Sequence, residues 1–311
     1  MVSSVIESAT GENFSDQFGI THELVAGHRD QLKPGWSRML EDEPASPSDA
    51  EAVTEMDGVT SRLKLARRVL ATFGGRFDVD DALVVGCGDV VEPMFVASAG
   101  ARSVVGIDLA FASEGDRLTR IADEYLAKNG QPRPAPDTIQ LRKHNVANSE
   151  LPDKSFDLVC SWRTLEHIAD PRSAFSEMHR LLKPGGYAYH EYNPFFAIDG
   201  GHSLVTLDIP WGHVRFDRED IAAYLNQFRP QEATRALSYF DNCLNRMTIA
   251  DLNEYATSAG FEILTVIPRT RTEDLVRVDA NLLTAAKRNH PTISLNDLIS
   301  RIVRVVLRRS R

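Results

Sequence analysis

Between residues 82 and 192, short apolar runs alternate with stretches whose apolar positions recur every three or four residues. The short runs predict buried strands, and the longer periodic stretches predict helices. Strands and helices in this alternating order favour a parallel sheet with right-handed crossovers. We expect strands at 82–85, 103–107, 139–146, 156–161 and 186–192, and helices at 93–99, 114–129 and 171–182.

The regions on either side of this alternation differ from it and from each other. Residues 1–50 are polar with little periodicity, and their acidic, Pro- and Ser-rich stretch 41–50 predicts a loop. Residues 193–246 are rich in Gly, His, Asp and aromatic residues and predict an insertion over one end of the sheet. Regular patterns elsewhere predict helices at 59–70, 247–260 and 273–288, a sixth strand at 261–268 and a last strand at 302–308.

Composition narrows the class of protein. A chain of 311 residues with 42% hydrophobic positions can bury one large α/β domain with additions, or two small domains. The formal net charge of -9 disfavours nucleic acid as a partner, because such a surface concentrates Lys and Arg. Five arginines in 301–311 form a local basic stretch, which we interpret as an exposed final strand with a charged end.

The three cysteines, Cys87, Cys160 and Cys243, are too few for a disulfide framework and form no C-x-x-C pair for zinc. This usage favours a reducing cytoplasm. The first ten residues lack a basic region followed by an apolar stretch, so no signal peptide is expected. No run approaches the roughly 18 apolar residues of a membrane span, so none is expected either.

Two glycines follow the first expected strand, in Gly86-Cys87-Gly88. Glycines at this place let the backbone turn tightly and approach a ligand where a Cβ would collide. Asp108 lies 20 residues after Gly88 and ends the second strand, where a carboxylate can accept hydrogen bonds from ribose hydroxyls. The pair suits a nucleoside cofactor, NAD included. A tight strand–helix turn beside a solvated Asp is the other interpretation.

Three further motifs follow in order along the chain. They are Leu151-Pro-Asp-Lys-Ser-Phe-Asp-Leu-Val-Cys-Ser, Thr164-Leu-Glu-His-Ile-Ala-Asp-Pro and Leu181-Leu-Lys-Pro-Gly-Gly. Together with the glycine loop, they make residues 60–192 resemble the class I, Rossmann-like S-adenosylmethionine-dependent methyltransferases. The resemblance implies a doubly wound α/β fold: a seven-stranded, mostly parallel sheet with an antiparallel last strand and an insertion after the fifth strand.

The resemblance also suggests four parts of the chain. We expect a partly flexible N-terminal extension at 1–58, a cofactor-binding core at 59–192, a substrate-side insertion at 193–246 and a C-terminal completion of the sheet at 247–311. In such enzymes an N-terminal helix often closes over the cofactor. Residues 57–68 are the candidate segment here.

The implied cofactor is S-adenosylmethionine, with S-adenosylhomocysteine as the product. Carried over by position, the glycine loop passes under the methionine and ribose, and Asp108 binds the ribose hydroxyls. The residues expected at the adenine are Leu109, Asn145 and Val146, and those expected towards the methionine end are Ser161, Trp162 and His167. Two positions depart from the family pattern: Val84 replaces a frequent acid, and Val90 replaces a frequent third glycine. The first change can weaken capture of the cofactor ammonium, and the second can alter the path of the loop.

The candidate acceptor-side groups are in the insertion. Methyl transfer to oxygen is an in-line displacement in which the protein positions the acceptor and removes its proton, and His is the usual base near neutral pH. His202, Asp208 and His213 surround Trp211 just after the fifth strand and are the candidate catalytic residues. The other interpretation is that either His only holds loop structure.

A metal is the competing interpretation of the same residues. His202, Asp208 and His213 could supply three ligands. The Glu166-His167 pair resembles the pair that binds a divalent ion in some methyltransferases, but Arg163 stands where those relatives carry a carboxylate. A divalent metal is therefore possible in principle but not the expected cofactor.

Three functions are compatible with the sequence. The first is methyl transfer to a hydroxyl of a small molecule or sugar. The insertion and the segment 290–299 support it through a fainter resemblance to methyltransferases of bacterial polysaccharide and secondary-metabolite clusters. The second is a non-catalytic relative on the same fold, for which Val84 and Val90 argue. The third is an NAD-dependent oxidoreductase, disfavoured by the missing third glycine and by the later motifs.

Overall fold

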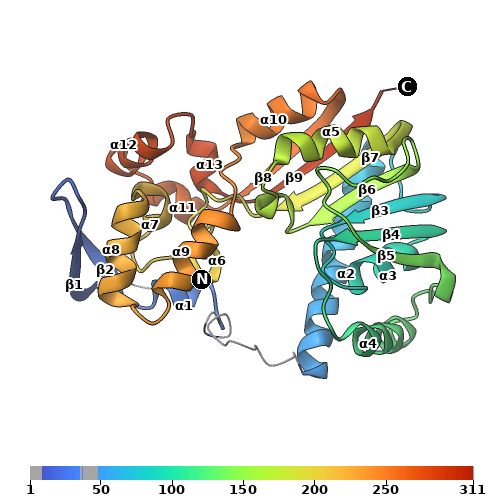
Figure 1. The fold of residues 1–311 in the computed structure, drawn as a ribbon, viewed down its shortest axis with the longest axis horizontal. Coiled ribbons are helices and arrows are strands. Elements are labelled where there is room, and N and C mark those ends of the chain that lie inside the picture. The colour runs from blue at the N-terminus through green and yellow to red at the C-terminus, as the bar shows by residue number, and fades with distance from the viewer. Residues whose placement is uncertain (1–8, 36, 38–47, 311) are drawn as a thin grey trace. The chain divides into compact units, whose positions relative to one another are not determined.

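A computed structural model describes residues 9–35, 37 and 48–310 (Figure 1). Of the predicted loop 41–50, residues 41–47 lie outside the described residues. Ser48 is the N-cap of the first long helix, α2 (Asp49–Thr72), and forms a capping box with Glu51. The chain divides into two compact units, a sheet unit (Ser46–Tyr192, Ala250–Ile267, Val303–Arg311) and a helical unit (Met1–Ala45, Asn193–Ile249, Pro268–Ile302).

The sheet unit is built on seven strands in the order β5-β4-β3-β6-β7-β9-β8. Neighbouring strands among the first five pair in parallel, and β7 pairs antiparallel with β9. The predicted fold class is therefore confirmed, including the antiparallel last strand and the insertion after the fifth strand of the sheet. The strands are β3 (Asp81–Val85), β4 (Ser103–Asp108), β5 (Ile139–Lys143), β6 (Phe156–Trp162), β7 (Leu182–Tyr192), β8 (Phe261–Thr270) and β9 (Ser300–Arg309).

Helices of the sheet unit bury apolar side chains in one continuous core with the strands. Ala66 and Leu70 of α2 are fully buried, as are Val84 of β3 and Phe95 of the helix after the glycine loop. Gly130 has φ 63 and ends its helix in the left-handed conformation, as the sequence predicts. Besides α2 the helices are α3 (Val91–Ser98), α4 (Gly115–Lys128), η2 (Pro136–Thr138), η3 (Leu165–His167), α5 (Pro171–Leu181) and α10 (Ile249–Ser258).

The last strand is not the exposed strand expected from its arginines. β9 lies between β7 and β8, and Val303 and Val305–Leu307 are fully buried. Within the sheet unit, two of its arginines pair with carboxylates: Arg304 with Glu191 at 2.6 Å and Arg308 with Glu262 at 2.6 Å. The expectation was wrong because the apolar positions between the arginines, rather than the arginines themselves, determine where the strand lies.

The helical unit has its own core around Trp211, whose indole N–H donates to the Leu298 carbonyl at 3.0 Å. A hairpin of β1 (Ala9–Ser15) and β2 (Thr21–Val25) lies in residues that the sequence pattern left without structure. The predicted helix at 273–288 is two helices, separated where Asp279 caps the second. The helices are α1 (His28–Leu32), α6 (His202–Val205), α7 (Gly212–Arg215), α8 (Arg218–Phe228), α9 (Ala233–Asn242), α11 (Thr272–Arg277), α12 (Ala280–Asn289) and α13 (Leu295–Ile299).

Two simple properties complete the description. Cys87 and Cys160 are both buried and form no disulfide. Among the described residues, no helix combines the length and apolar character that crossing a bilayer requires.

Candidate cofactor site and acceptor-side residues

The glycine loop connects β3 to α3 and needs glycine at both positions. Gly86 has φ 67 and Gly88 has φ 63, in the left-handed region that glycine adopts without strain. A Cβ on Gly86 would lie 2.1 Å from Cγ2 of Thr164, whereas a Cβ on Gly88 would meet nothing within 4 Å. Gly86 is therefore required by close packing, and Gly88 leaves open space beside the backbone. Cys87 between them is buried, and burial raises the pKa of its thiol.

Asp108 ends β4 beside this loop and is half-buried. Its Oδ2 accepts from the Gly88 amide at 2.8 Å, and its Oδ1 accepts from the Ala110 amide at 3.3 Å. A carboxylate has about four lone-pair sites, so two amides leave capacity for hydroxyl donors. The next residue, Leu109, is 72% exposed, which leaves an apolar surface for a flat ring.

Asn145 and Val146 follow β5, the strand that pairs with β4. The Asn145 side chain is exposed, and its Oδ1 accepts from the Ala147 amide at 2.9 Å. Val146 is buried. The parallel strands thus bring the loop, Asp108 and this turn to the carboxyl edge of the sheet, where open α/β sheets bind ligands. Their individual cofactor contacts remain predictions.

Ser161 and Trp162 end β6 and are buried. The Ser161 hydroxyl pairs with Nδ1 of His190 at 2.8 Å, and burial lowers the pKa of His190 to about 3. The Trp162 ring packs against Tyr189, with ring centroids 6.0 Å apart. His167, in the single turn η3, is exposed. Of these three predicted methionine-end residues, only His167 presents its side chain to solvent in this structure.

The two departures from the family pattern have physical explanations. Val90 has φ -84, an ordinary right-handed conformation that does not need glycine. Val84 is completely buried in the middle of β3, where an unpaired carboxylate would be costly. The loop therefore keeps a regular path without its third glycine.

A cluster of charged side chains beside the loop was not predicted. Glu55 and Arg62 lie on α2, Asp89 follows Gly88, Glu92 lies on α3 and Arg163 follows β6. Arg163 Nη2 lies 2.6 Å and Arg62 Nη2 lies 2.9 Å from Glu55 Oε1. Burial raises the pKa of Glu92 to about 8, against the opposing charges of Arg62 and Arg163. The cluster ties α2 to the strand end that carries Arg163.

Arg163 has a structural role that its sequence position did not predict. From the sequence, Arg163 was noted only because it stands where some relatives carry a metal-binding carboxylate. In the structure Arg163 has φ 54, a left-handed conformation uncommon for a non-glycine residue. Long-range pairs of this kind leave no periodic signal in a sequence, so only the spatial arrangement reveals them.

Asp208, a candidate catalytic residue, is held by a buried network of the helical unit. Burial alone would raise its pKa, but Arg229 at 2.7 Å, the Arg29 amide and the Tyr224 hydroxyl hold it below its usual range. Nearby, Arg29 forms a bidentate pair with Glu232 at 2.8 and 2.7 Å. These contacts give Asp208 a clear structural role.

The two candidate histidines differ in their surroundings. His213 is 1% exposed, its Nε2 lies 2.9 Å from the Phe195 carbonyl, and burial lowers its pKa to about 3. His202 is half-buried, opens α6 and has φ 52. Its ring lies 6.2 Å from that of Tyr239. His202 is thus the less buried of the two residues, although its Nε2 atom is covered, and its backbone is held in a conformation that costs free energy.

The metal interpretation is not supported by these contacts within the helical unit. The Asp208 carboxylate faces the Arg229 guanidinium, whose charge opposes a cation at the same oxygens. The Nε2 of His213 is engaged with a carbonyl, so this nitrogen carries its proton and offers no lone pair. Two of the three proposed ligands are therefore already committed to protein partners.

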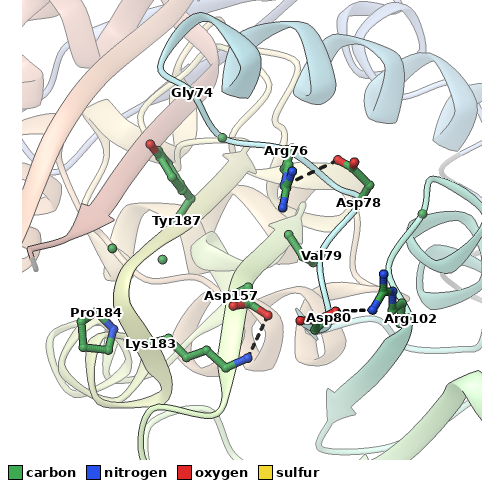
Figure 2. A pocket seen from close by; sticks show the side chains of 14 residues that line it. Gly74, Arg76, Asp78, Val79, Asp80, Arg102, Asp157, Lys183, Pro184 and Tyr187 are labelled. Carbon is green, nitrogen blue, oxygen red and sulfur yellow. Dashed lines mark hydrogen bonds and ion pairs between the residues drawn. The ribbon is translucent and has the colours of Figure 1, made fainter.

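A hollow of about 460 Å³ lies at the opposite edge of the sheet, at the amino ends of its strands (Figure 2). Its polar side chains are paired with one another: Lys183 contacts Asp157 at 2.9 Å, and Arg102 contacts Asp80 at 3.0 Å. Ligands of open α/β sheets bind at the carboxyl ends instead. We therefore assign this hollow no part in cofactor binding.

Comparison with known proteins identifies the domain that contains the glycine loop. Residues 83–190 match the family model of a methyltransferase domain. The Ubiquinone biosynthesis O-methyltransferase of Nitrosospira multiformis is 31% identical over 134 residues, which are 41% of this chain and 51% of that protein. The one of Paracidovorax citrulli is 36% identical over 121 residues, which are 39% and 44% of the two chains. The chain thus spans about half the length of the curated relatives it matches.

Among solved structures, an S-adenosylmethionine-dependent methyltransferase from Mesorhizobium loti has a TM-score of 0.46 at 17% identity, covering 78% of this chain and 96% of that one. The matched family region includes the glycine loop, Asp108 and the strand ends at Asn145 and Ser161. Residues 83–190 of the chain therefore form a methyltransferase domain, and the sheet has the strand order and pairing expected for the class I S-adenosylmethionine-dependent methyltransferases.

Proposed function

We propose that this protein transfers the methyl group of S-adenosylmethionine to a hydroxyl oxygen of a small molecule or sugar. The observation that carries the proposal is the carboxyl edge of β3 and β4. There, Gly88 leaves space that a Cβ would occupy, and Asp108 holds the loop while keeping acceptor capacity. The relatives of Nitrosospira multiformis and Paracidovorax citrulli are named O-methyltransferases, which supports oxygen as the acceptor atom.

The protein groups at this edge fit the parts of the cofactor. Asp108 would accept the ribose hydroxyls, the exposed Leu109 would lie against the adenine, and the Asn145 side chain would accept from its amino group. When bound, S-adenosylmethionine supplies an electrophilic methyl group and a sulfur leaving group. The remaining work of the protein is to orient the acceptor and to receive its proton.

His202 is the base we propose for that proton. The less buried His202 suits the role better than the buried His213, whose pKa is lowered to about 3 and which would hold a proton weakly at neutral pH. Asp208 would act by fixing the fold of the insertion. No step in this scheme needs a metal ion. The free thiols of Cys87 and Cys160 support a cytoplasmic location, which belongs to the same proposal.

Replacing Asp108 by alanine tests the cofactor assignment. We expect the affinity for S-adenosylmethionine to fall about 5- to 150-fold, equivalent to about 1–3 kcal/mol of charge-assisted hydrogen bonding. Asp108→Asn should lose less, since its oxygen can still accept from the Gly88 amide. The measurement is calorimetric titration of each purified variant.

The matched control is Asp116→Ala, which removes an exposed carboxylate from the first turn of α4. It should leave cofactor affinity within about twofold of the wild type, because it lies away from the strand ends. Equal affinities of the Asp108→Ala variant and the wild type would contradict the assignment.

A further inference from the structure

The helical unit contains a pocket of about 190 Å³, distinct from the hollow described above in the sheet unit. Three of its lining side chains are cationic and one is anionic. The cations are Arg269, Arg271 and Arg301, and the anion is Asp199. Ligand pockets for whole small molecules typically exceed about 300 Å³, so this space suits one functional group of a ligand rather than the entire molecule.

The backbone brings two of the arginines to the same side. Residues two apart in an extended strand point to one face, and Arg269 and Arg271 are two apart at the end of β8, with Arg271 extended at φ -124. Both are exposed, and within the described part of the chain neither has a carboxylate partner. Two guanidinium groups therefore face this pocket without a neutralising acid of their own.

The third arginine is fixed in place. Arg301 Nε and Nη2 donate to the two oxygens of Asp274 at 2.5 and 2.6 Å, and Asp274 is 1% exposed. Such a fork geometry immobilises the guanidinium, so less side-chain entropy is lost when it contacts a ligand. Asp199 in turn lies 3.9 Å from Lys33, which reduces its negative influence on the pocket.

We propose that this pocket binds an oxyanion, the carboxylate or phosphate group of a small-molecule ligand, through Arg269, Arg271 and Arg301. Guanidinium groups match the planar geometry of these oxyanions and form short, charge-assisted hydrogen bonds with them. The side-chain charges of the pocket favour an anion over a neutral or cationic group. The residues that line the pocket belong to the helical unit, whereas the proposed cofactor residues belong to the sheet unit.

The test is calorimetric titration of the full chain, at low ionic strength, with inorganic phosphate and separately with malonate. We expect the wild type to bind at least one of the two, and the Arg269→Ala/Arg271→Ala double variant to bind it at least about tenfold more weakly. Preference for phosphate or for malonate identifies which oxyanion the pocket takes. Equal binding by the double variant, or no binding of either anion by the wild type, would overturn the proposal.

Two further variants make the result specific. Arg67→Ala/Arg68→Ala removes an adjacent pair of exposed arginines from α2 and should leave anion affinity within about twofold. Asp199→Asn removes the acid of the pocket and should tighten anion binding about threefold or more. Unchanged or weaker binding by the Asp199→Asn variant would place the anion elsewhere. All variants should keep the wild-type affinity for S-adenosylmethionine, so failure of that cofactor to bind would refute the proposed function and leave the anion site standing.

Discussion

Replacing His202 by alanine is expected to lower the turnover of methyl transfer about a hundredfold, equivalent to about 2.7 kcal/mol in the activation barrier. The affinity for S-adenosylmethionine should stay unchanged, since the proposed partner of His202 is the acceptor hydroxyl rather than the cofactor. The physical reason is loss of the group that receives the acceptor proton. The measurement is the rate of S-adenosylhomocysteine formation with an acceptor found by screening hydroxylated small molecules and sugars.

The backbone conformation of His202 requires a matched control. Its φ of 52 is unfavourable for alanine but tolerated by asparagine. If the imidazole is the base, His202→Asn and His202→Ala should lose turnover to a similar extent. Full turnover in the His202→Asn variant would show that only the backbone matters there and that the base is another group.

Replacing Glu232 by alanine should destabilise the helical unit by about 3–5 kcal/mol. Arg29 and Glu232 are almost completely buried, with side-chain exposures of 3% and 7%. Without Glu232, the Arg29 guanidinium stays buried with its main partner removed, although its Nε still donates to the Ser203 carbonyl at 2.7 Å. Urea unfolding followed by tryptophan fluorescence measures the loss.

The control for this variant is Glu23→Ala on β2. Glu23 belongs to the same unit but is exposed, so its removal should change the free energy of unfolding by no more than about 0.5 kcal/mol. If the two variants unfold at the same urea concentration, the Arg29–Glu232 pair does not stabilise the unit and the account of the buried network fails.

The sequence predicted the central parallel strands well, because both faces of these strands are buried. The interior residues of β3 and β4 are all buried, and the observed bounds of each strand differ by one residue from those expected. Buried parallel strands read as continuous apolar runs, so their pattern is strong. The glycine loop and Asp108 could be located from the sequence for the same reason. The loop directly follows β3 and Asp108 ends β4, so predicting these two strands also predicts where the loop and Asp108 lie.

The parts that the sequence did not predict depend on contacts between distant residues. In β1 only Phe14 is buried, so the strand shows no alternation and its pairing with β2 leaves little trace in the pattern. Asp208 was placed among the catalytic candidates by its neighbours in sequence, whereas its closest charged partner, Arg229, is 21 residues away. The Glu55–Arg163 pair spans 108 residues. Spacing along the chain cannot reveal such pairs.

The most direct test of the account is a calorimetric titration of the purified wild-type protein with S-adenosylmethionine, S-adenosylhomocysteine and NAD. We predict binding of both sulfur compounds with dissociation constants of about 1–100 μM, in the range usual for enzyme ligands, and no binding of NAD. This result would support the carboxyl edge of β3 and β4 as a methyl-donor site. Binding of NAD alone, or of none of the three, would contradict the proposed methyl transfer.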